Sequence, residues 1–185
     1  MALVEMVAGA LAGSQALKAD ALDFLGDTAT YAISHFVIGM PLVWRARAAL
    51  FKGVSLGAMG LWVLGSTIHH ALVLGIPRAE VMGMIGMLAF AANLTSVVIL
   101  LKYRDGDANV RSVWLCSRND ALGNAAVVLA AGGVWTTATA WPDIIIAGVM
   151  ASLFLWSSVQ IVRQAHRELE QAGSSGAMTR REEVP

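Results

Sequence analysis

Three aspartates lie inside apolar stretches that are long enough to cross a lipid bilayer. Asp23 and Asp27 are four residues apart in one stretch, and Asp120 lies in another, four residues after Cys116, the only cysteine of the chain. Burying a carboxylate in the hydrocarbon core costs about 2.5–3.5 kcal/mol or more. Such residues usually face a cavity or one another, and they usually act on an ion or a proton.

The spacing of these residues predicts a metal site. Helical residues four apart share a face, so Asp23 and Asp27 point the same way, and so do Cys116 and Asp120. If the two helices are neighbours, three carboxylates and one thiolate converge at one level of the membrane. Four such ligands suit a tetrahedral divalent ion, zinc above all. The thiolate favours zinc or cadmium, and the carboxylates keep cobalt, iron and manganese open.

The same four groups predict a link between metal and protons. Four anions cannot crowd together in a medium of low dielectric, so some of them hold protons when the metal is absent. Metal entry then expels protons. A proton-coupled exchanger needs this competition for one site that is reached alternately from each side. We therefore expect the metal to be the transported substrate, with no resident cofactor.

The composition indicates an integral membrane protein. The chain is 57% apolar and only 14% charged, whereas a soluble domain carries about 25% charged residues. We predict an all-α bundle with a transport domain over residues 1–166 and a short disordered cytoplasmic tail over residues 167–185. The first of six spans is short, and we expect its helix to begin upstream of Met1. The predicted spans are approximately residues 1–17, 21–41, 50–74, 81–101, 110–134 and 143–162.

Basic residues between the spans predict the orientation. Lysine and arginine are enriched in cytoplasmic loops. Only Lys18 and Arg78 lie on one side of the predicted bundle, against eight basic residues on the other. The second side is therefore predicted to be cytoplasmic, together with both termini, and we expect a bacterial inner (cell) membrane. The eight are Arg45, Arg47, Lys52, Lys102, Arg104, Arg111, Arg163 and Arg167.

Other polar residues in or beside the spans are candidates for accessory roles along an ion path. For Asp20 and Asp143 the simpler interpretation is capping of a helix N-terminus. Asn93 and Asn124 lie deep enough to hydrogen-bond between helices. His69 and His70 could gather metal at an entrance, although an interfacial position without a ligand role is the simpler interpretation. The accessory candidates are Asp20, Asn93, Asn119, Asn124 and Asp143.

Three segments resemble the cation diffusion facilitator family. Residues 5–27, EMVAGALAGSQALKADALDFLGD, resemble its first two helices, of which the second typically reads A-D-A-x-H/D-x-x-x-D. Residues 107–124, DANVRSVWLCSRNDALGN, resemble its fifth helix, which usually carries H-x-x-x-D after an N-x-R-x-A/S entry. The run WPDIIIAGVMASLFLW resembles its sixth helix, and the likeness covers about residues 4–165.

The resemblance implies a six-helix exporter of divalent metals, driven by inward proton flow and often homodimeric. Its transport site maps onto Asp23, Asp27, Cys116 and Asp120. Cys116 stands where most members have histidine, so the metal preference of those members does not carry over. With Asp23 in place of histidine, the chain resembles the members that also accept iron or manganese. The usual cytoplasmic metal-binding domain does not follow the sixth helix, so we expect a member without it.

Two other functions remain open from the sequence. An intramembrane aspartyl protease also uses two aspartates on neighbouring helices. However, Gly26-Asp27 is only a fragment of the G-x-G-D pattern that those enzymes carry, and we expect no enzyme. A membrane subunit that binds metal without transporting it is the second alternative. No basic patch indicates a nucleic-acid partner.

Overall fold

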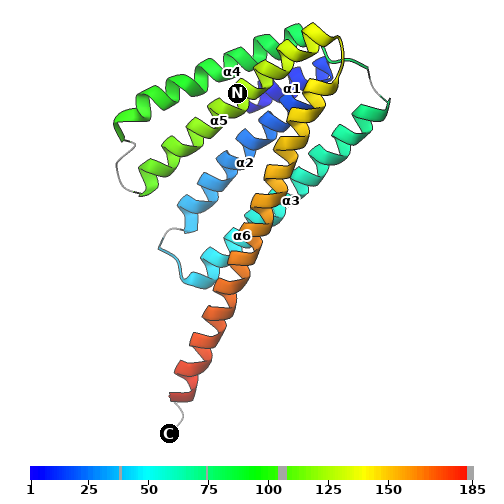
Figure 1. Cartoon of the computed structure of the whole chain (residues 1–185). Coiled ribbons are helices and arrows are strands. Elements are labelled where there is room, and N and C mark those ends of the chain that lie inside the picture. The colour runs from blue at the N-terminus through cyan, green and yellow to red at the C-terminus, as the bar shows by residue number, and fades with distance from the viewer. Residues whose placement is uncertain (38, 74, 104–107, 183–185) are drawn as a thin grey trace.

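The computed structural model describes residues 1–37, 39–73, 75–103 and 108–182 (Figure 1). Side chains are described over the same ranges, except at residues 34, 73, 103, 108–116 and 173–182. The described part is all helical, as predicted. Its elements are α1 (Ala2–Ala12), α2 (Gln15–Val37), α3 (Leu42–Val73), α4 (Ala79–Leu100), the 3-10 turn η1 (Leu101–Tyr103), α5 (Ala108–Thr137) and α6 (Trp141–Glu182).

Three of these helices are long and apolar enough by themselves to cross a membrane. They are α3, α4 and α6, over Leu42–Leu72, Ala79–Leu100 and Trp141–Ala172. Helices α2 and α5 have 23 and 30 residues, so they are long enough, but they carry the polar side chains of the candidate site. Large apolar side chains such as Leu72 and Leu129 are 79% and 74% exposed on the bundle surface. Such a surface fits lipid rather than water.

The bundle is built from two closely packed helix pairs with α1 and α2 beside them. Helix α3 packs along α6, and α4 packs along α5, while α2 contacts α1, α3, α5 and α6 (Figure 1). The C-terminal ends of α1, α3 and α5 lie at one end of the bundle, together with the N-terminal ends of α2, α4 and α6. The C-terminal ends of α2 and α4 and the N-terminal ends of α3 and α5 lie at the other end. We call these the α1–α2 end and the α2–α3 end. Arg45, Arg47 and Lys52 in the first turns of α3 and Lys102 in η1, which were predicted to be cytoplasmic, belong to the α2–α3 end.

Glycines allow α3 and α6 to approach closely. A Cβ atom at Gly57 would stand 2.6 Å from Ser158 Oγ, and one at Gly53 would stand 2.8 Å from Val162 Cγ2. The Ser158 hydroxyl donates a hydrogen bond to the Gly53 carbonyl at 2.7 Å. Small residues of this kind let helix backbones pack closely within a membrane. The α3–α6 pair is therefore tightly joined on one side of the cavity described below.

The first two helices meet earlier than the sequence pattern predicts. Helix α1 ends at Ala12 because Gly13 adopts the left-handed conformation, with φ 72°, which glycine tolerates best. Ser14 then caps α2, with its Oγ accepting a hydrogen bond from the Leu17 N–H at 3.0 Å. The predicted first span, 1–17, was therefore too long, and the second begins at Gln15 rather than near residue 21. Gly9 lies against Lys18, whose Cγ would be 3.0 Å from an added Cβ.

Two other boundaries also differ from the prediction. Helix α3 begins at Leu42, directly after Pro41, because the residues before the predicted start at 50 are good helix formers. Helix α6 continues to Glu182, whereas the predicted sixth span ends near residue 162. Two features favour this longer helix. Gln164 Nε2 donates a hydrogen bond to Glu168 Oε1, one turn later, at 3.0 Å. No proline lies between Pro142 and Pro185 to interrupt the helix.

Candidate metal centre

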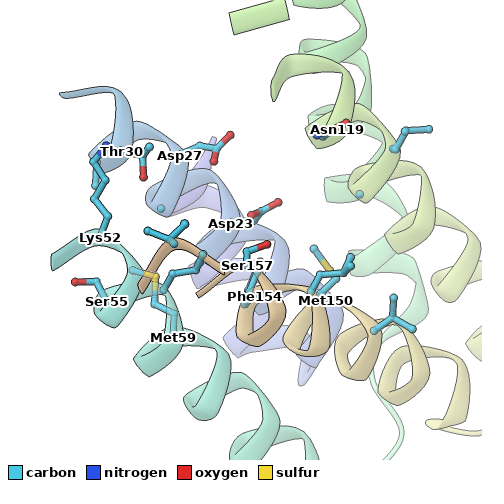
Figure 2. A pocket seen from close by; sticks show the side chains of 18 of the residues that line it. Asp23, Asp27, Thr30, Lys52, Ser55, Met59, Asn119, Met150, Phe154 and Ser157 are labelled. Atoms are coloured by element: carbon cyan, nitrogen blue, oxygen red, sulfur yellow. The ribbon is translucent and has the colours of Figure 1, made fainter. Parts of the chain in front are cut away.

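A cavity of about 780 Å³ lies between α2, α3, α5 and α6. Most of its lining is apolar, but α2 and α5 contribute acidic and amide groups (Figure 2). The cavity follows α2 from Asp23 to Ile33, towards the α2–α3 end of the bundle. Its polar lining residues are Asp23, Asp27, Thr30, Lys52, Ser55, Asn119 and Ser157.

Asp23 and Asp27 share one face of α2, as their spacing predicts. Figure 2 shows both carboxylates pointing away from the α2 axis on the side where Asn119 of α5 lies. Both side chains are half-buried, and the two carboxylates interact electrostatically. Two acidic groups therefore face the same internal space from one helix.

Asp120 brings a third carboxylate close to this pair. It follows Asn119 on α5, is half-buried, and interacts electrostatically with both Asp23 and Asp27. Its backbone carbonyl accepts a hydrogen bond from Asn124 Nδ2 at 2.8 Å. The three sequence-predicted carboxylates therefore lie in one region of the bundle, where they repel one another.

These carboxylates do not form a closed metal site in this structure. Among the side chains that the structure describes, no three carboxylate, imidazole or thiolate groups are arranged to hold one ion. The fourth predicted ligand, Cys116, lies in α5 but outside the described side chains. Asp23 and Asp27 line the cavity from α2, and Asn119 lines it from α5.

A hydrogen-bonded polar layer joins α2, α4 and α5 on the α1–α2 side of the carboxylates. Asn124 Nδ2 donates to Asp20 Oδ1 and Oδ2 at 3.1 and 3.0 Å. Asn124 Oδ1 in turn accepts a hydrogen bond from Asn93 Nδ2 at 3.4 Å. The interhelical role predicted for the two asparagines is confirmed. The capping role predicted for Asp20 is wrong, because α2 begins at Gln15 and Asp20, only 3% exposed, braces α5 instead.

Asp143 caps a helix, but not the one in which it lies. Its Oδ1 accepts hydrogen bonds from Ser14 Oγ at 2.6 Å and the Ala16 N–H at 3.0 Å, and its Oδ2 accepts one from the Gln15 N–H at 2.8 Å. The carboxylate thus satisfies free N–H groups at the positive end of α2. We call this set, Ser14, Gln15, Ala16 and Asp143, the outer clasp. It ties α2 to α6 at the α1–α2 end.

Two buried ionisable residues were not identified as important from the sequence. Glu5 is 1% exposed and His70 is 2% exposed, and neither side chain has a hydrogen-bond partner among the described residues. His70 lies in the last turn of α3, where it packs beside Gly13 and interacts electrostatically with Asp143, whereas His69 is exposed. An acidic residue in the apolar run of α1 was the signal that could have identified Glu5.

Comparison with known proteins agrees with this architecture. A sequence model of the cation efflux transmembrane domain matches residues 45–169, which include Cys116 and Asp120 but not the α2 pair. No curated protein matches the chain. Members of this family are transporters rather than enzymes. Because the match covers most of the chain, the protein belongs to the cation efflux family and is a multi-pass membrane protein that transports cations.

Proposed function

We propose that the protein exports divalent metal ions, with Asp23, Asp27, Asp120 and Cys116 as the transport ligands. The observation that carries this proposal is the pair of carboxylates that α2 presents to an intramembrane cavity, with the Asp120 carboxylate near them on α5. Zinc, cadmium and cobalt are the proposed substrates, and iron and manganese extend the set because three of the four ligands are oxygen donors.

The arrangement of the cavity supports metal entry from the α2–α3 end. On the opposite side, the Asp20–Asn124–Asn93 layer and the outer clasp join α2 to α4, α5 and α6. The α2–α3 end is cytoplasmic by the distribution of basic residues. Metal loaded from this end and released at the other leaves the cell, so the proposed direction is export.

Alternating access follows from the demands of a small divalent ion. Zinc binds oxygen and sulfur ligands at about 2.0–2.3 Å, so one ion that contacts both helices must draw α2 and α5 together. This movement closes the cavity that now separates them. Release then requires the Asp20 layer and the outer clasp to part, because both hold the α1–α2 end shut.

Protons are proposed as the coupling ion. Clustered carboxylates in a medium of low dielectric repel one another, so protons replace the metal once it leaves. A gradient of protons into the cell would then drive the metal outwards. We further propose a bacterial cell membrane as the location and a homodimer as the assembly; the resemblance to the cation diffusion facilitator family motivates the second point.

Metal flux in proteoliposomes tests the function. Purified protein is reconstituted, and uptake of zinc, cadmium, cobalt, iron and manganese is followed under an imposed pH gradient. Asp27→Asn keeps the shape of the side chain and removes its charge, and it should abolish uptake. Glu80→Gln makes the same change at an exposed position of α4 and should leave uptake unchanged. Unchanged flux in Asp27→Asn would contradict the site assignment.

The same experiment separates export from metal binding without transport. Equilibrium binding of zinc is measured on the purified protein in parallel with flux. Binding together with flux supports the transporter. Tight binding without flux for any of the five metals would instead favour a metal-binding membrane subunit.

A further inference from the structure

Glu5 is the most completely isolated acidic side chain in the described part of the bundle. It lies in α1, is 1% exposed, and neither carboxylate oxygen has a hydrogen-bond partner among the described residues. An ionised carboxylate that is buried without a partner is very costly. The same group is tolerated when it carries a proton, so the environment of Glu5 is one in which a proton is held.

The charged groups that interact with Glu5 come from two helices and from the start of the chain. Asp20 of α2 and Asp120 of α5 interact with it electrostatically, and both repel its charge. The α-amino group of Met1, just ahead of α1, attracts it. Helix α4 presents the neutral Asn93 to the same layer. The charge on Glu5 is therefore sensitive to what is bound at Asp120.

Asp20 and Glu5 differ in how their oxygens are satisfied. Both oxygens of Asp20 accept hydrogen bonds from Asn124 Nδ2, which stabilise an ionised carboxylate. Glu5 has no comparable donor. Of the two acidic groups, Glu5 is thus the one whose charge no hydrogen bond stabilises.

The surroundings of this pair suit a proton better than a metal ion. Neither Glu5 nor Asp20 lines the cavity, and a Cβ atom at Gly123 would stand only 3.1 Å from Asp20 Oδ1. A metal ion needs several ligands and room for them, and the described side chains include no cluster of three acidic, imidazole or thiolate groups. A proton needs neither.

We propose that Glu5 is a proton-carrying group of this transporter, separate from the metal ligands, which takes up and releases one proton in each transport cycle. This inference rests on the proposed function and adds a second site to it. A metal ion at Asp120 cancels the repulsion that this carboxylate exerts on Glu5, so Glu5 ionises and loses its proton. Departure of the metal restores the repulsion, and Glu5 is protonated again.

Proton coupling in Glu5→Gln proteoliposomes tests the proposal. Glutamine keeps the shape of the side chain but cannot exchange a proton. Each coupled proton multiplies the metal accumulated at steady state by about ten for every unit of pH gradient. Glu5→Gln should therefore lower accumulation about tenfold per pH unit, and zinc affinity should lose the part of its pH dependence that Glu5 contributes. Glu80→Gln, the exposed control, should change neither quantity. Undiminished accumulation in Glu5→Gln overturns the proposal.

A second measurement does not depend on transport. Infrared difference spectroscopy of the purified protein in lipid detects the C=O stretch of protonated carboxyl groups. We expect a band that titrates with pH, is lost in Glu5→Gln and returns, shifted, in Glu5→Asp. A spectrum that is identical in Glu5→Gln and in the unchanged protein overturns the assignment of the proton to Glu5. A titrating Glu5 band in a protein without metal flux would instead support the proton site and overturn the export proposal.

An N-terminal extension separates Glu5 from the amine beside it. Extending the chain before Met1 by a few uncharged residues moves the α-amino group away from Glu5. If Glu5 itself carries the proton, adding Glu5→Gln to the extended protein should still lower metal accumulation about tenfold per pH unit. The contrary result is that the extension alone lowers metal accumulation about tenfold per pH unit and that Glu5→Gln lowers it no further. This result would assign the proton to the amine and overturn the proposal.

Discussion

The carboxylate of Asp143, in the first turn of α6, accepts a hydrogen bond from the Ser14 hydroxyl at 2.6 Å, across 129 positions of sequence. Ser14 is at the same time the cap of α2, because its Oγ accepts the Leu17 N–H. The start of α6 is therefore fixed to the start of α2. Any movement that opens the α1–α2 end must either carry both helices together or break this contact.

Asp143→Asn should destabilise the protein measurably. The amide has one acceptor oxygen in place of two and removes the negative charge that faces the N-terminus of α2. Hydrogen bonds to charged groups contribute about 1.5–3 kcal/mol each, so a loss of about this size is expected. Unfolding by denaturant in mild detergent measures it. Ser14→Ala should cost about 1 kcal/mol, and the double variant should cost less than the sum of the two. Strict additivity would show that the two side chains are not coupled.

Asn124→Asp should disrupt the polar layer without changing the size of the side chain. The change replaces the amide N–H that Asp20 accepts with a second carboxylate oxygen. Two anions at hydrogen-bonding distance within the bundle repel strongly. We expect lower stability at neutral pH and partial recovery on acidification, because protonation removes the repulsion. Asn124→Ala, which removes the same amide donor without adding a charge, is the matched control and should show no such recovery on acidification. Equal stability curves for the two variants would contradict the role of this layer.

Asp23→Asn should weaken zinc binding at least about tenfold, which corresponds to about 1.4 kcal/mol. The change removes one anionic ligand but keeps the shape of the side chain. Isothermal titration calorimetry on the purified protein measures the affinity. Asn119→Ala changes an uncharged residue that lines the same cavity and should have a smaller effect. An unaltered zinc affinity in Asp23→Asn would remove this residue from the ligand set.

Cys116→His should shift the metal preference from cadmium towards zinc. Thiolate is a soft ligand that favours cadmium, whereas imidazole suits zinc. The ratio of cadmium to zinc uptake in the same liposomes measures the change. The same ratio before and after the exchange would show that Cys116 does not bind the transported metal.

Gly57→Ala should loosen the α3–α6 pair. The new Cβ would meet Ser158 Oγ at 2.6 Å, and overpacking of this kind typically costs about 1–3 kcal/mol. Gly65→Ala is the matched control on α3, because no heavy atom lies within 4 Å of its added Cβ, and it should be neutral or slightly stabilising. Thermal unfolding of both variants gives the comparison. Equal melting temperatures would mean that the close approach at Gly57 does not contribute to stability.

The sequence determined the features that repeat along a single helix. Apolar runs of sufficient length predicted the helices, and the spacing of Asp23 and Asp27 placed both on one face of α2. The depth of Asn93 and Asn124 predicted their contact between helices. Each of these properties follows from the period of the helix and from the cost of leaving polar groups in lipid.

Only the tertiary structure decided which polar groups meet. Asp20 and Asp143 are both typical capping residues, yet Asp20 accepts hydrogen bonds from α5, and Asp143 caps α2 from 128 positions away. The isolation of Glu5 likewise depends on how α1 packs against its neighbours. Helical periodicity fixes the direction of a side chain from its own axis. The partner it reaches depends on how separate helices pack, and this is set by close contacts such as those at Gly57 and Gly9, which no local pattern records.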